Sequence, residues 1–272
     1  MNAITFKTIG IGVNFSPNLE ANINEAARLA LCLGSKLVLI HVGETSDEKS
    51  KTFLTFLKPF VNNGLEFEIL FKSGDPVDVI LSSTLEKNID LLIIGALKKE
   101  NFLKYYLGSI ARKITRKASC SVLLLINPSI ERVPCEHIVV NGLKDPKTKE
   151  TVNTAFLVGH KLGVGKITVV EEIDQEEVSV KVDDDKTLRK STIIKERLRL
   201  REEARVKKVL DSIPADYTKD ITIKSQPIFG KRGYSIGHYA QVARADLLVM
   251  NAPSKMTFWD RLFPHDIEHI LT

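Results

Sequence analysis

The sequence of 272 residues lacks the features that mark secreted, membrane and disulfide-rich proteins. Its three cysteines, Cys32, Cys120 and Cys135, form no Cys-x-x-Cys pair, which excludes a disulfide scaffold and fits a reducing compartment. The longest apolar runs, such as 37–40 and 122–126, are far shorter than the ~20 residues of a membrane helix. The first residues show no basic segment followed by an apolar core, so we expect no secretory signal and a cytoplasmic protein.

An excess of charge of one sign is also missing. There are 39 lysines and arginines against 34 aspartates and glutamates, and the net charge of +5 is too small to indicate nucleic-acid binding by itself. Hydrophobic residues make up 43% and charged residues 27%, which is typical of globular proteins. At roughly 150 residues per domain, the length predicts about two domains, with neither a membrane nor a nucleic acid as partner.

The first half of the chain alternates strands and helices. Five short apolar runs rich in β-branched residues are separated by segments of helical periodicity. The runs cover residues 8–13, 36–42, 65–71, 90–94 and 122–126. Strands that are apolar on both faces and joined by helices require a parallel sheet covered on both sides. Residues 1–130 therefore predict an α/β domain with an open, five-stranded parallel sheet.

The same order of elements returns over residues 134–272, after a linker bracketed by Pro128 and Pro134. The clearest repeat is between 90–94 (Asp-Leu-Leu-Ile-Ile) and 246–250 (Asp-Leu-Leu-Val-Met). The chain is thus a tandem repeat of one unit of ~130 residues. Only 21 residues follow Asn251, too few for another helix and strand, so we expect the second domain to lack its last strand.

The second copy also contains two charged segments. Residues 171–185 carry eight carboxylates and one lysine, which predicts a solvated loop. Residues 190–212 predict a long basic helix with a buried apolar stripe that includes Ile194, Leu198 and Val206. We interpret its basic face as solvated, with the acidic loop as a nearby partner; an acidic protein or a nucleic acid is the alternative.

The segment from Gly95 to Ser109 has the pattern of a phosphate-binding loop. Gly95 ends a parallel strand, where open α/β sheets place their ligand crevice. Gly108-Ser109 opens the next helix, whose free N–H groups and positive end favour a phosphate. This segment resembles the universal stress protein family (UspA-like), whose nucleotide-binding members have Gly, two residues, Gly, nine residues, Gly, then Ser or Thr. Further marks of the family, in its order, are 13–16 (Val-Asn-Phe-Ser), 74–76 (Gly-Asp-Pro) and 120–122 (Cys-Ser-Val).

The resemblance covers nearly the whole chain. It implies two Usp domains in tandem, each Rossmann-like (adenine nucleotide alpha hydrolase-like), over residues 1–130 and 134–272. It also implies that the first domain binds ATP or a related adenine nucleotide, with Mg²⁺ only as a phosphate counterion. Two positions depart from the family pattern: its middle glycine is Lys98, and its aspartate after the first strand is Asn14. The implied nucleotide-binding residues are Val13, Asn14, Ser16, Val42, Gly95, Lys98, Gly108, Ser109, Ser121 and Val122.

The second domain carries a degenerate version of this site. Aligning the two copies places Leu143 at the position of Asn14, and Asn251 at that of Gly95. Pro264-His265 stands where the first copy has Gly108-Ser109. Leucine cannot form a hydrogen bond with a ribose, and proline removes an amide from the phosphate site. We therefore expect no nucleotide in the second domain.

These observations, with the resemblance, imply a stress-response regulator rather than a turnover enzyme. No catalytic base lies in the motif, so we assign no catalytic residue and expect at most weak ATP hydrolysis. His265 and His269 share a helix face but lack an evident third ligand, so we expect no metal site. The alternative is a protein-interaction module in which both sites are degenerate. Because fifth strands pair between domains in the resembling family, we also expect a homodimer through 122–126.

Overall fold

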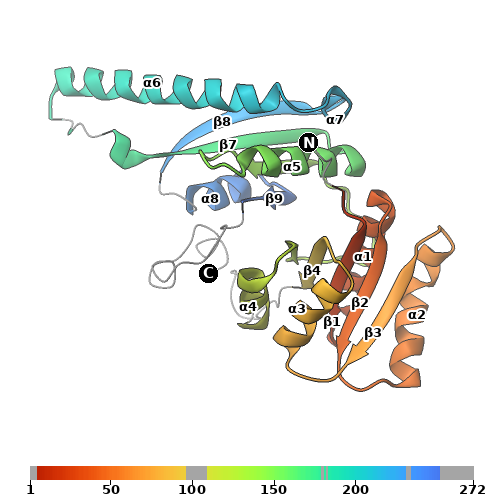
Figure 1. Ribbon diagram of the computed structural model, residues 1–272. Helices are drawn as coiled ribbons and strands as arrows, with labels where there is room; N and C mark the ends of the chain where they lie inside the picture. The colour runs from red at the N-terminus through yellow and green to blue at the C-terminus, as the bar shows by residue number, and fades with distance from the viewer. Residues whose placement is uncertain (1–4, 96–108, 179–180, 182, 231–233, 252–272) are drawn as a thin grey trace. The chain divides into compact units, whose positions relative to one another are not determined.

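The computed structural model describes residues 5–95, 109–178, 181, 183–230 and 234–251, and the chain divides into two compact units. The first ends at Val133 and the second begins at Pro134. Each is a parallel α/β unit (Figure 1). The α/β fold class that the sequence predicts is therefore confirmed. Lys98 and Gly108, as well as the chain after Asn251, lie outside the described residues.

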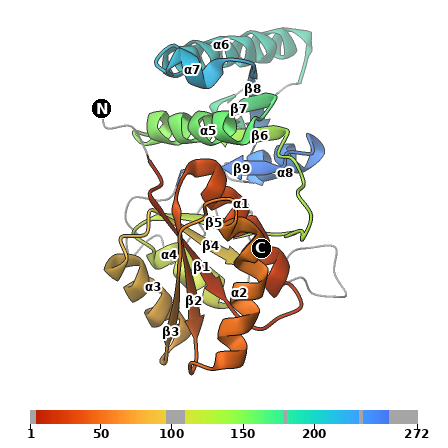
Figure 2. The ribbon, with the colours of Figure 1, turned by 90° about the vertical axis from the view of Figure 1, so that its right-hand side faces the viewer.

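The first unit contains a five-stranded parallel sheet in the order β3-β2-β1-β4-β5. Its helices α1 and α2 cover one face of the sheet, and α3 and α4 cover the other (Figure 2). The strands are β1 Thr8–Val13, β2 Lys36–Val42, β3 Phe67–Lys72, β4 Leu91–Gly95 and β5 Ser121–Leu125. The helices are α1 Leu19–Leu33, α2 Asp47–Val61, α3 Pro76–Glu86 and α4 Ser109–Lys117.

Local sequence signals set the ends of these helices. The helix α1 stops at Gly34, whose φ of 70° is the left-handed conformation that glycine adopts without steric strain. The helix α3 begins because the Asp75 carboxylate accepts hydrogen bonds from the N–H groups of Val77 and Asp78, with Pro76 in the first turn. The three central strands supply the core, in which Ile9, Leu37 and Leu92 are fully buried.

The second unit repeats this topology in a four-stranded parallel sheet, in the order β8-β7-β6-β9. Its strands are β6 His137–Asn141, β7 Lys166–Asp174, β8 Thr222–Gly230 and β9 Leu247–Val249. Its helices are α5 Thr148–Leu162, α6 Asp185–Leu210, α7 Ala215–Thr218 and α8 Tyr234–Val242, with a short 3₁₀ turn at Gln175–Glu177. Phe156 of α5 and Val206 of α6 pack on one face of the sheet, and Ile236 of α8 packs on the other.

The two units share one hydrogen-bond device at equivalent positions. In the first, the Asp90 carboxylate accepts from the backbone N–H groups of Lys7 and Thr8 at 2.8 and 3.0 Å. In the second, the Asp246 carboxylate accepts from the N–H groups of Glu136 and His137, both at 2.9 Å. Each aspartate ties the start of the first strand of its unit to the start of the fourth. The shared contact shows that Asp90 and Asp246 occupy equivalent positions in the two copies.

The structure corrects the interpretation of the acidic segment. Residues 171–174 belong to β7, which pairs with β8 as far as Asp174 and Gly230. Glu171 is only 1% exposed, so the segment is not a solvated loop throughout. The basic helix α6 also begins earlier than expected, because Asp184 and Thr187 form a reciprocal capping box at its start. The predicted absence of a fifth strand concerns residues after Asn251, outside the described part.

Candidate functional site

A crevice of the kind that binds ligands in open α/β sheets is expected where β1 and β4 end. These strands are neighbours in the sheet, and the helices that follow them lie on opposite faces. The connections that leave these two strands therefore diverge, and no connection covers the carboxyl ends of the strands. This place is the topological switch point of the sheet. Asn14 follows β1 directly, and Gly95 is the last residue of β4.

Asn14 is exposed at the start of the connection from β1 to α1. Two backbone hydrogen bonds fold this connection: the N–H of Ser16 donates to the Asn14 carbonyl at 2.9 Å, and that of Leu19 donates to the Ser16 carbonyl at 3.0 Å. Within the described residues, the Asn14 side chain has no hydrogen-bond partner. Its amide therefore offers one donor group and one acceptor to a ligand.

Gly95 passes close to α1. A Cβ atom at this position would lie 2.8 Å from Nδ2 of Asn22, so any other residue would displace that side chain. The Oδ1 atom of Asn22 is buried and has no hydrogen-bond partner in the part of the chain that the structure describes. A buried acceptor without a donor is uncommon. The glycine is thus explained by packing, and the amide beside it has an unused acceptor.

An aromatic cluster, which the sequence reasoning missed, borders the end of β1. Phe15 is 50% exposed, and its ring centroid lies 5.5 Å from that of His41 and 5.4 Å from that of Phe53. His41 is buried, and its Nδ1 atom lies 3.2 Å from the Val13 carbonyl oxygen. Val42, the predicted neighbour of a base, follows His41 and is half-buried. The available signal was Phe15 itself, an aromatic inside the 13–16 motif.

The remaining predicted residues do not all come together. Ser109 begins α4 and is exposed, but Lys98 and Gly108 fall outside the described residues. Ser121 and Val122 pair with Leu91 and Leu92, at the amino-terminal end of the sheet. At about 3.3 Å per residue, Ser121 lies roughly 13 Å and Val122 roughly 10 Å along the strand from the level of Gly95. We therefore correct the prediction and leave Ser121 and Val122 out of the site.

The equivalent edge of the second unit is filled by the side chains of that unit. Leu143 takes the place of Asn14 and is buried. Arg205 of α6 donates hydrogen bonds to the Gly142 carbonyl and, at 3.3 Å, to the Leu143 carbonyl. Glu202 holds the same guanidinium through a hydrogen bond of 2.7 Å from Nε. Where the first unit exposes a polar side chain, the second closes the edge with its own helix.

Glu171 lies at the position that corresponds to His41 in the first unit, since both are the sixth residue of the second strand. Its Oε1 atom accepts a hydrogen bond from the Ser225 hydroxyl at 2.9 Å, and Oε2 has no partner among the described residues. Burial raises the pKa of this carboxyl group to about 7, and the nearby Arg205 offsets part of the effect. The second unit thus holds a buried carboxyl group whose pKa is about 7.

The family match in sequence covers part of the first unit, whereas the likeness of fold covers both units. Residues 57–125 match the model of the universal stress protein family. The universal stress protein YxiE of Bacillus subtilis (strain 168) is 27% identical over 62 residues, which cover 23% of this chain and 42% of that protein. A universal stress protein of Methanothermobacter thermautotrophicus (strain Delta H) is 30% identical over 64 residues, 24% of this chain and 43% of that protein. The matched part spans less than half the length of these relatives.

The likeness of fold extends over both units. The crystal structure of a universal stress protein from Archaeoglobus fulgidus DSM 4304 aligns with 97% of this chain and 94% of its own, with a TM-score of 0.66. At 17% identity this likeness shows the fold alone. Together with the family match over residues 57–125, it confirms the resemblance to the universal stress protein family that the 95–109 segment predicts. Among the described residues, no helix has both the length and the apolar character needed to cross a bilayer.

Proposed function

We propose that the chain is a stress-response regulator that binds one adenine nucleotide, at the carboxyl edge of the sheet in its first unit. The observation that carries the proposal is the contrast between two equivalent edges. In the first unit the edge presents an exposed amide at Asn14, whereas in the second Leu143 is buried and Arg205 covers the backbone. One copy keeps the groups that a polar ligand needs, and the other has replaced them.

The ribose and the phosphates of a nucleotide each have a candidate partner of matching chemistry in the first unit. The Asn14 amide can donate to and accept from the ribose hydroxyls. The amino-terminal end of α4, which starts at Ser109 and has no acidic residue in its first turn, is suited to the phosphates. Lys98 would add an ammonium group, and Mg²⁺ would serve only to neutralise phosphate charge. The choice of adenine rests on the resemblance to the family.

The test is isothermal titration calorimetry of the full chain with ATP, ADP and AMP. We expect the unmodified protein to bind at least one of them, and Asn14→Leu, which installs the residue of the second unit, to weaken binding by about tenfold because it removes the ribose hydrogen bonds. Gly108→Val should abolish binding, since a β-branched side chain blocks the approach of the phosphates. Asn62→Leu makes the same chemical change at the exposed end of α2 and should leave binding unchanged.

Absence of heat with all three nucleotides would refute the proposal. Native mass spectrometry of freshly purified protein adds a second measurement, because a co-purified ligand of another mass would identify a different occupant. If neither method finds a ligand, the interaction-module interpretation is the better one.

A further inference from the structure

The basic residues of α6 fall into two groups that differ in their partners. In the carboxyl-terminal half, the three arginines are paired, Arg199 with Glu196 and Glu203, Arg201 with Glu177, and Arg205 with Glu202, whereas Lys207 and Lys208 have no ion pair among the described residues. In the amino-terminal half no ion pair forms within the described part of the chain. This second group consists of Lys186, Arg189, Lys190, Lys195 and Arg197, of which Lys195 lies over the ring of Phe229 with Nζ 5.9 Å from its centroid. Half of the helix therefore carries positive charge that the described part of the chain does not neutralise.

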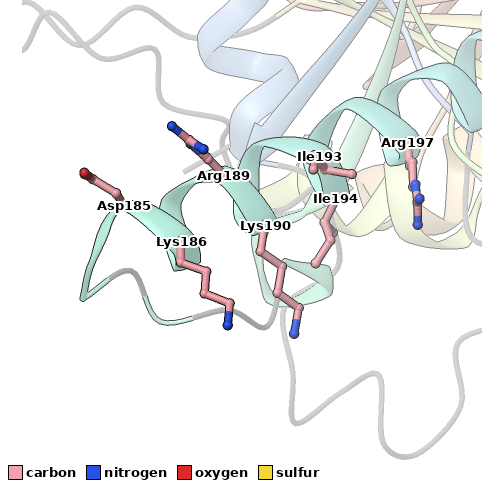
Figure 3. A pocket seen from close by; sticks show the side chains of 7 residues that line it. All are labelled: Asp185, Lys186, Arg189, Lys190, Ile193, Ile194 and Arg197. Carbon is pink, nitrogen blue, oxygen red and sulfur yellow. The ribbon is translucent and has the colours of Figure 1, made fainter.

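Four of these cations line one hollow, together with Asp185 and two isoleucines. It has a volume of about 600 Å³, and its described lining comes from the first turns of α6. Figure 3 shows Lys186, Lys190, Ile194 and Arg197 pointing to the same side of the helix. Their spacing of three or four residues keeps them on one face. We call this surface the basic groove, whose seven described lining residues include one acid, Asp185, beside Lys186, Arg189, Lys190, Ile193, Ile194 and Arg197.

The basic groove is not needed to pack the second unit. Between Asp185 and Arg197 only Ser191 is buried, whereas Val206, further along α6, belongs to the core. Ile193, which also lines the hollow, is 54% exposed. A polar helix that buries so little gains little stability from tertiary packing, so this half of α6 is better explained by a contact with another molecule.

We propose that the basic groove binds an acidic peptide segment of a partner protein. Four cations outnumber the one carboxylate of the lining, and together with two isoleucines they are complementary to carboxylates placed around one or two apolar side chains. A membrane surface fits less well, because an interfacial helix needs a broad apolar face, and here the apolar part is a pair of residues inside a hollow. This inference does not depend on a nucleotide in the first unit.

The experiment is a fluorescence anisotropy titration of the full chain. The probe is a fluorescein-labelled peptide of glutamate with leucine at every third or fourth position. We expect binding at low ionic strength that weakens as salt is added, since exposed charges are screened. The double variant Arg189→Glu, Lys190→Glu should weaken binding by about tenfold or more. The matched control Lys207→Glu, Lys208→Glu makes the same change of charge at exposed positions of the same helix, and should bind as the unmodified protein does.

Two further measurements separate a groove from a general attraction of charges. Ile193→Ser keeps every cation and should still weaken binding, because it removes an apolar contact. Circular dichroism establishes that each variant is folded before its binding is compared. Equal losses in the two double variants, or no effect of Ile193→Ser, would overturn the proposal. So would tighter binding to phosphatidylserine vesicles or to a single-stranded RNA than to the peptide.

Discussion

The buried carboxyl group of Glu171 should make the stability of the second unit depend on pH. Its pKa is about 7 in the folded state, against an ordinary value of 4.5, because burial disfavours the ionised form. Below pH 4.5 the group is protonated in both the folded and the unfolded chain. As the pH rises, the unfolded chain ionises first, so the free energy of unfolding falls until the pH passes the folded pKa. At 1.36 kcal/mol for each pH unit, the loss amounts to about 3 kcal/mol.

Replacing Glu171 with glutamine should remove this dependence. The amide oxygen can still accept the hydrogen bond from Ser225, and the side chain keeps its shape without a charge. We therefore expect Glu171→Gln to raise the free energy of unfolding by about 3 kcal/mol at pH 8 and by less than about 1 kcal/mol near pH 5. Glu150→Gln removes a carboxylate from an exposed site on α5 and should show no such trend.

The assay is urea unfolding followed by far-ultraviolet circular dichroism at a series of pH values. Hydrogen exchange of peptides from β7 and β8 assigns the change to the second unit. A difference between Glu171→Gln and the unmodified protein that stays constant with pH would refute the reasoning. A variant that is less stable at pH 8 than at pH 5, each relative to the unmodified protein, would show that Glu171 is ionised and stabilised by Arg205.

Two further predictions concern the edges of the sheets. Because the N–H of Ser121 donates to the Asp90 carbonyl, alternation along β5 directs the N–H of Leu124 away from β4. We expect the unmodified protein to be a homodimer by light scattering and Leu124→Pro to be monomeric; a monomeric unmodified protein at high micromolar concentration would exclude pairing through β5. Arg205→Ala leaves the Leu143 carbonyl without its side-chain donor and should destabilise the second unit by about 1–3 kcal/mol in urea unfolding, whereas an unchanged midpoint would show that the closed edge contributes no stability.

The parts of the fold that the sequence predicted well are those that local periodicity determines. Strands β1, β2 and β4 coincide with short apolar runs of the sequence, and they occupy the centre of the first sheet. The repeated Asp-Leu-Leu motif identified the second copy because Asp90 and Asp246 perform the same backbone contact. The acidic segment was misassigned because eight carboxylates indicate a solvated loop, although β8 continues to pair with its first residues.

The candidate site was harder to predict, because it depends on which ends of the strands meet. Gly95 follows from the rule that ligands bind at the carboxyl ends of parallel strands, and Asn14 was assigned through the resemblance to the family. Ser121 was placed by its motif, but it opens its strand and lies at the other end of the sheet. Arg205 reaches the edge of the second unit from a helix, although it lies 62 residues along the chain from Leu143. Such a contact leaves no pattern in a single sequence.

The aspartate that joins the first and fourth strands of each unit also bears on the order of folding. Asp90 contacts residues that precede it by 82 and 83 positions, and Asp246 contacts residues at separations of 109 and 110. Contacts between distant parts of a chain form slowly, because a long loop must close before they are gained. During synthesis β1 can pair early with β2, but its pairing with β4 requires that β4 has left the ribosome. In the second unit the corresponding delay is longer, because α6 is synthesised between β6 and its partner β9.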